Sequence, residues 1–197
     1  MTAEDFKHFW DSTYPDTIPI GNYFKHDYSD RWFRIHSLPN SQRYPSDQED
    51  WKILLDRQNI ILTDLLANES SILIVTGDHH AEGYLELYPI DEVKSIKSFT
   101  FTRLEPIDLH LLGPEQYEKG QTYIPMFTVQ SWDAHKFDEV LKDIAEWNLE
   151  AFFISVHNQC IVSPYDGGMD IILQDSQTRD FYRTKYEAWL SPRKDGL

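Results

Sequence analysis

Cysteine is almost absent from this sequence. The single residue of this type, Cys160, cannot form a disulfide within the chain, and no metal site can be built from several thiolates. This scarcity is typical of proteins from a reducing compartment, so we expect a cytoplasmic protein. Long apolar runs are absent as well: none approaches the roughly 20 residues that a membrane-spanning helix requires, and residues 1–8 do not resemble a secretory signal. We therefore expect no membrane partner.

Basic residues are scarce too. The chain has 18 Lys and Arg against 33 Asp and Glu, which gives a formal net charge of -15. Nucleic-acid backbones attract proteins through Lys and Arg, so this balance argues against nucleic-acid binding. The acidic residues are dispersed, as expected for solvated surfaces that keep a protein soluble. Alternatively, the same negative charge provides an acidic surface that binds a basic partner protein.

Linkers and repeats are missing from the 197 residues, while 41% of them are hydrophobic and 14% aromatic. A chain of this length and composition can bury a large core without disulfides. We therefore predict a single globular domain over residues 1–197. The many aromatic residues also permit a homo-oligomer.

Hydrophobic periodicity and capping residues predict an α+β fold, with helices packed on a mostly antiparallel sheet. Its C-terminal part should run strand, helix, β-meander, helix. The expected helices follow Thr2, cover 20–27, and follow caps at Ser46, Asp133 and Ser176. The expected strands cover 31–37, 72–75, 84–88, 95–103, 123–132, 151–156, 160–162 and 169–173. The expected turns and loops include 78–83 and a long loop over 104–120, which is either functional or wrongly predicted.

The best candidate for a binding site lies in the first strand and the loop after it. Arg34 and His36 are two residues apart, so they share one face of that strand. With Arg43 from the loop they can form a pocket for a phosphate or a carboxylate, walled by Trp32 and Tyr44. The alternative is that both side chains only satisfy groups within the protein, because carboxylates are plentiful.

A second candidate cluster contains Asp166 and Asp170 in an Asp-Gly-Gly turn, where glycine favours positive φ. If either carboxylate oriented His36 as a general base, the protein would be a small hydrolase or transferase. The turn interpretation is the simpler one, since Asp is a common turn residue.

Other reactive residues point to no recognised chemistry. His79 and His80 are adjacent, so on an extended chain they point to opposite faces and seldom bind one ion. Cys160 lies near His157 without an evident orienting acid, and a small buried hydrophobe is its ordinary role. We therefore expect no metal ion and no cofactor.

Four segments of the sequence resemble those of a protein family. They are RWFRIHSLP (31–39), RYP (43–45), PYDGGMD (164–170) and WLSP (189–192). Together they are similar to an uncharacterised family of bacterial proteins, which implies a bacterial, cytosolic protein and no particular activity. The sequence therefore favours a non-catalytic binding or interaction module that takes a small anion, a carboxylate-bearing segment or a basic partner.

Overall fold

The computed structural model describes residues 1–81, 90–191 and 193. Their strands form one eight-stranded sheet in the order β1-β8-β7-β6-β2-β5-β3, with β4 also pairing with β5. Every strand pair in the described part of the chain is antiparallel, which confirms the predicted fold class. The strands are β1 (Trp32–His36), β2 (Ser71–His80), β3 (Thr102–Arg103), β4 (Ile107–Asp108), β5 (Thr122–Ser131), β6 (Phe152–Ser155), β7 (Cys160–Tyr165) and β8 (Gly168–Ile172).

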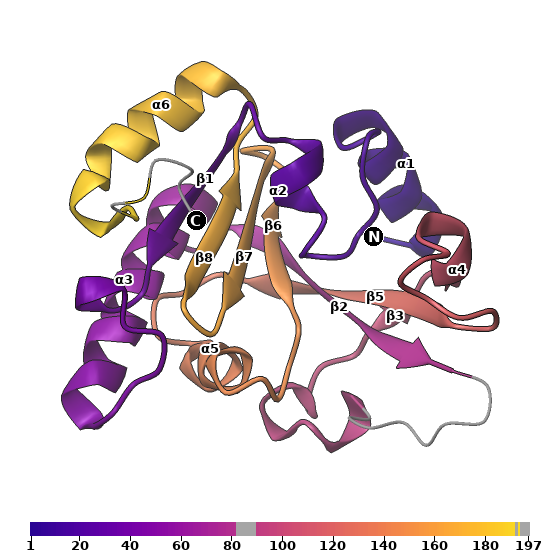
Figure 1. The fold of residues 1–197 in the computed structure, drawn as a ribbon, viewed down its shortest axis with the longest axis horizontal. Coiled ribbons are helices and arrows are strands. Elements are labelled where there is room, and N and C mark those ends of the chain that lie inside the picture. The colour runs from indigo at the N-terminus through magenta and orange to yellow at the C-terminus, as the bar shows by residue number, and fades with distance from the viewer. Residues whose placement is uncertain (82–89, 192, 194–197) are drawn as a thin grey trace.

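Helices lie on both sides of the sheet, with α1 on the side opposite α3 and α6 (Figure 1). The larger core lies under α3, α5 and α6, and the smaller one, rich in aromatic side chains, lies under α1 and α2. The α-helices are α1 (Ala3–Thr13), α2 (Phe24–Asp27), α3 (Gln48–Leu66), α4 (Leu109–Leu112), α5 (Asp138–Ala145) and α6 (Ser176–Lys185). Short 3-10 helices cover Pro39–Ser41, Ile90–Glu92, Lys94–Ile96 and Glu187–Trp189.

Strand alternation explains why two cores form. In β2, Ile72 and Ile74 belong to the core under α3 and α5, whereas Leu73 and Val75 belong to the core under α1. Successive side chains of a strand point to opposite faces, so a continuous apolar run fits a strand that is covered on both sides. The smaller core is closed by ring contacts such as Phe6 with Phe127, whose centroids are 4.7 Å apart.

The start of α1 agrees with its prediction, whereas the starts of the other predicted helices differ by one or more residues. Thr2 caps α1 with a complete capping box, as expected. For α3 the cap is Asp47 rather than Ser46, because the Asp47 carboxylate accepts a hydrogen bond from the Asp50 N–H. Asp175 rather than Ser176 caps α6 for the same reason. In each case an aspartate next to the predicted serine has the extended backbone that a cap requires.

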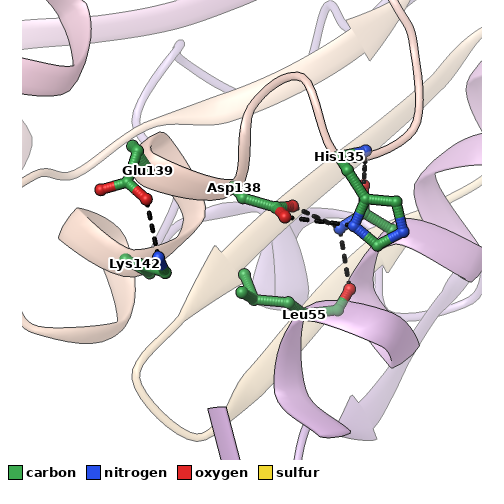
Figure 2. A network of polar contacts seen from close by, with 6 residues as sticks. Leu55, His135, Asp138, Glu139 and Lys142 are labelled. Atoms are coloured by element: carbon green, nitrogen blue, oxygen red, sulfur yellow. Dashed lines mark hydrogen bonds and ion pairs between the residues drawn. The ribbon is translucent and has the colours of Figure 1, made fainter. Parts of the chain in front are cut away.

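The starts of α2 and α5 lie furthest from their predictions. The helix predicted over 20–27 begins only at Phe24. Helix α5 begins at Asp138, not directly after Asp133. Between them His135 has a φ of 66°, in the left-handed region. A closed set of hydrogen bonds holds this turn: buried Asn59 accepts from the His135 N–H at 2.7 Å and donates to Asp138 at 2.7 Å, while the His135 ring meets Asp138 at 3.1 Å (Figure 2). These bonds tie α5 to α3, because Asn59 lies on α3.

The middle of the chain contradicts three sequence predictions. The run 95–103 is not a strand, since only Thr102–Arg103 pairs with β5 while Lys94–Ile96 forms a 3-10 helix. Its apolar residues pack individually against the larger core instead. The predicted turn at 78–83 is wrong at its start, because β2 continues to His80. The loop predicted over 104–120 contains β4 and α4, and the strand predicted at 84–88 lies outside the described residues.

Candidate functional site

A cross-strand row of polar side chains lies on the sheet face that carries α2. Arg34 of β1 is directly opposite Asp170 of β8, and Asp170 is directly opposite Ser163 of β7. Residues directly opposite each other in antiparallel strands place their side chains on the same face. The register therefore brings together the two candidate clusters, which lie 136 residues apart in the sequence.

Arg34 and Asp170 form a bidentate ion pair. The Arg34 Nε and Nη2 atoms donate to the two Asp170 carboxylate oxygens at 2.7 Å each, and the Trp32 indole N–H donates to one of them at 2.8 Å. The two charged side chains are only 13% and 10% exposed. Burial lowers the pKa of Arg34, but the bonds and charge of Asp170 outweigh that effect and raise it. The Arg34 guanidinium also lies 4.6 Å from the centre of the Tyr165 ring.

The second pair joins Arg43 to Asp166, which occupies the tight turn between β7 and β8. The Asp166 carboxylate is 1% exposed, whereas the Arg43 side chain is 57% exposed. Burial raises the pKa of Asp166, but hydrogen bonds from Arg43, Trp147 and Tyr44 outweigh it and lower the pKa overall. The turn is the predicted hairpin, but no positive φ occurs at its glycines. Glycine is instead needed at Gly168, where a Cβ would lie 2.0 Å from the Ile35 carbonyl oxygen.

His36 does not converge with either aspartate. Its Nε2 atom is buried without a hydrogen-bond partner among the described residues, while Asp166 and Asp170 are occupied by arginines. Burial, and then the charges of Arg34 and Arg57, lower the pKa of His36. Among the described residues, no hydrogen bond joins His36 to either aspartate, because Asp170 is bonded to Arg34 and Asp166 to Arg43, so the structure adds no support to the hydrolase or transferase alternative.

A cleft of about 350 Å³ adjoins both ion pairs. Of the predicted site residues, Arg34, Arg43, Asp166 and Asp170 line it, whereas Trp32, His36 and Tyr44 are not among the described lining residues. Other residues that line the cleft escaped the sequence analysis, including Asn22, Lys25, Trp147, Glu150, Phe152 and Ser163. Strand alternation could have identified Ser163, because it lies two residues after Ile161 and therefore shares the same face of the strand. Nothing in the sequence places Lys25 or Glu150 beside the first strand.

The segment before α2 forms one wall of the cleft by approaching β7 closely. A Cβ on Gly21 would lie 2.8 Å from the Ser163 hydroxyl oxygen, so a larger residue would push this wall outward. Trp147, which is 58% exposed and follows α5, also lines the cleft, as does Arg43, whose guanidinium is 5.9 Å from its ring. The cleft is thus lined by segments from several distant parts of the chain.

The remaining reactive residues lie elsewhere. Cys160 is buried, its thiol contacts the Leu65 carbonyl oxygen at 3.6 Å, and burial raises its pKa to about 12. His79 lies on β2 with its Nε2 atom 4.0 Å from a Glu150 carboxylate oxygen. Among the residues that the structure describes, no three His, Cys, Asp or Glu side chains are grouped as metal ligands.

A comparison with protein families supplies the identification. The family described as "Domain of unknown function (DUF3885)" matches residues 20–194. The chain belongs to this family. Membership of DUF3885 agrees with the resemblance to an uncharacterised family, and the matched segment contains the whole cleft. No curated protein and no solved structure matches the chain. Within the described residues, none of the helices has the length and apolar character needed to cross a bilayer.

Proposed function

We propose that this DUF3885 protein is a non-catalytic binding module whose cleft takes a carboxylate or a similar small anion. The observation that carries the proposal is an open cleft whose wall offers hydrogen-bond donors and cations, while its buried carboxylates already have partners. Its volume of about 350 Å³ falls at the lower end of ordinary ligand pockets, roughly 300–1,000 Å³.

The charges left for a ligand belong to Lys25 and Arg43. Lys25 is half-buried at the cleft and has no ion-pair partner in the described part of the chain. Arg43 donates to Asp166 through its Nε atom, and its side chain is 57% exposed. The Arg34 guanidinium is committed to Asp170, so it serves as a fixed wall rather than as the main anion ligand. Asn22 and Ser163 add neutral donors.

A thermal-shift screen over small carboxylates and phosphates tests this proposal. A ligand present at 100 times its Kd stabilises the folded state by about 2.7 kcal/mol, so binding raises the unfolding midpoint. We expect at least one anion to raise it, and the variants Lys25→Gln and Arg43→Gln to lose the shift. Lys52→Gln is the matched control, because Lys52 is exposed on α3 and lies outside the cleft. A panel without any shift, or shifts retained in both cleft variants, would overturn the proposal.

A further inference from the structure

Three exposed side chains share one buried carboxylate at the cleft. Asp166 accepts hydrogen bonds from the Arg43 Nε atom and from the side chains of Trp147 and Tyr44. Each of these three donors is more than half exposed, whereas the carboxylate itself is shielded from water. A buried charge must be well hydrogen-bonded to be tolerated, and here the bonds come from side chains that packing leaves free. Asp166 therefore holds in place side chains that would otherwise move at the surface.

Trp147 also has an unusual backbone for so large a residue. Its φ of 63° lies in the left-handed region, which residues other than glycine rarely adopt. Its N–H donates to the Ile144 carbonyl oxygen at 3.2 Å, in the turn that follows α5. Backbone held in such a conformation by its surroundings is concentrated at binding and catalytic sites. The exposed Trp147 ring is thus kept in position both by its backbone and by Asp166.

The cation of Arg43 lies against the aromatic surface. Arg43 and Trp147 both line the cleft, and the guanidinium is 5.9 Å from the centre of the Trp147 ring. The stem of Arg43 packs on the turn between β7 and β8, where a Cβ on Gly167 would lie 3.5 Å from the Arg43 Cγ atom. The cation and the ring are therefore neighbours on one wall, so a single small molecule can contact both.

This combination fits a particular kind of anion. A small hydrated ion such as acetate uses only the cation and leaves the Trp147 ring in water. An aromatic ring that carries a carboxylate uses both groups, because the ring removes apolar surface from water and stacks on the indole. The cleft of about 350 Å³ has room for such a ring, since ordinary ligand pockets begin at roughly 300 Å³.

We infer that the ligand is an aromatic carboxylate, bound by Arg43 through its carboxylate and by Trp147 through its ring, and that Asp166 is the positioning residue for both side chains. This inference rests on the proposed function, since it names the class of anion that the cleft takes. Asp166 orders both side chains before the ligand arrives, so that binding loses less side-chain entropy.

NMR titrations with three probes test the class of ligand. The probes are benzoate, acetate, which lacks the ring, and benzamide, which lacks the charge. The chain has six tryptophans, and the indole N–H signal of Trp147 is identified by its loss in Trp147→Ala. We expect benzoate to shift this signal and to bind roughly 2- to 12-fold more tightly than acetate, the range for one aromatic contact. Benzamide should bind about tenfold more weakly than benzoate or worse, because it lacks the charged partner of Arg43.

Removing the Trp147 ring should abolish the preference for benzoate. Trp147→Ala should bind benzoate and acetate equally well, since the Arg43 cation remains. Phe181→Ala is the matched control, because Phe181 is an exposed aromatic residue on α6 that is not among the described residues lining the cleft. A preference for benzoate that persists in Trp147→Ala would overturn the inference.

Asp166→Asn tests the positioning role. This variant should move the Trp147 indole signal before any ligand is added and should weaken benzoate binding roughly fivefold, because side chains must then be ordered on binding. If Asp166 only competed with the ligand for Arg43, loss of its charge would strengthen binding, and that result would overturn the positioning role. Glu146→Gln, which removes an exposed charge next to Trp147, is the control.

The unchanged protein provides a second measurement that does not depend on how Asp166→Asn folds. The Trp147 indole N–H should exchange with water more slowly than that of a free exposed indole, because Asp166 accepts its hydrogen bond. Rapid exchange would overturn the positioning role without any substitution.

The outcomes also separate this inference from the proposed function. If acetate binds as tightly as benzoate and Arg43→Gln abolishes both, the aromatic ligand fails and the anion site stands. If benzamide binds as tightly as benzoate, no carboxylate is recognised and the inference fails. If no anion binds at all, both the inference and the proposed function fail.

Discussion

The Arg34 guanidinium and the Asp170 carboxylate face each other across β1 and β8 through two parallel hydrogen bonds of 2.7 Å. The pair joins the edge strand to the sheet and forms one wall of the cleft. Both side chains are largely shielded from water, so each charge is stabilised by its partner instead of by solvent.

Breaking this pair from one side should destabilise the protein more than removing it altogether. We expect Arg34→Met and Asp170→Leu each to lower the free energy of unfolding by about 3–5 kcal/mol, because each leaves a buried charge without its partner. The double variant should lose less than either single variant. Urea denaturation of all four proteins measures the coupling. Losses that simply add would show that the two side chains do not support each other.

His36 should make stability fall as the pH decreases. Its pKa is lowered in the folded protein by burial and by Arg34 and Arg57, so the unfolded chain takes up the proton first. Stability is therefore full above the unfolded pKa of about 6.5 and declines as the pH falls toward the folded pKa, by at most about 1.4 kcal/mol per pH unit. His36→Gln should flatten this part of the curve measured by urea denaturation between pH 7 and 5. The exposed His157→Gln should not, and identical curves for both variants would contradict the assignment.

Gly168→Ala should be among the most damaging single changes. The added Cβ would lie 2.0 Å from the Ile35 carbonyl oxygen and 2.9 Å from the Tyr165 hydroxyl, so β1 and β8 would have to separate. We expect a loss of about 3 kcal/mol or more in the free energy of unfolding. Gly113→Ala is the control, since its nearest neighbour would be 3.5 Å away, and should change stability by about 0.5 kcal/mol or less. Equal effects at the two positions would disprove the close approach.

Asn59→Ala should loosen the connection between α3 and α5. It removes the acceptor of the His135 N–H and a donor to Asp138, and we expect a loss of about 1–3 kcal/mol. Hydrogen exchange at the His135 amide should also become faster, which a loss of packing elsewhere would not produce. Asn148→Ala, at an exposed asparagine, is the control. Unchanged exchange in Asn59→Ala would show that the turn is held by other contacts.

The fold could be predicted where local patterns are strong. Alternation and turn residues indicated the β6–β7–β8 meander, and the long α3 followed from its apolar stripe. The 95–103 segment was mistaken for a strand because Ile96, Phe99 and Phe101 are apolar, although tertiary packing rather than strand pairing buries them. Apolar composition alone does not separate these two situations.

The candidate site was only partly accessible from the sequence. Both arginines and both aspartates could be selected as chemically interesting, but strand register decides which of them pair. A shift of one residue would have placed Arg34 on the other face of the sheet. Lys25 and Glu150 carry no local signal, because only the sheet order brings α2 and the start of β6 to one cleft.

Helix α1 ends before residue 20, where the family match begins, yet its Phe6 and Trp10 cover the aromatic face of the sheet. Shortening the protein to the matched region would strip that cover from Phe127 and Phe152. The trimmed chain would expose a contiguous apolar surface and would aggregate or precipitate on expression. Family limits are therefore a poor guide to where this molecule can be cut.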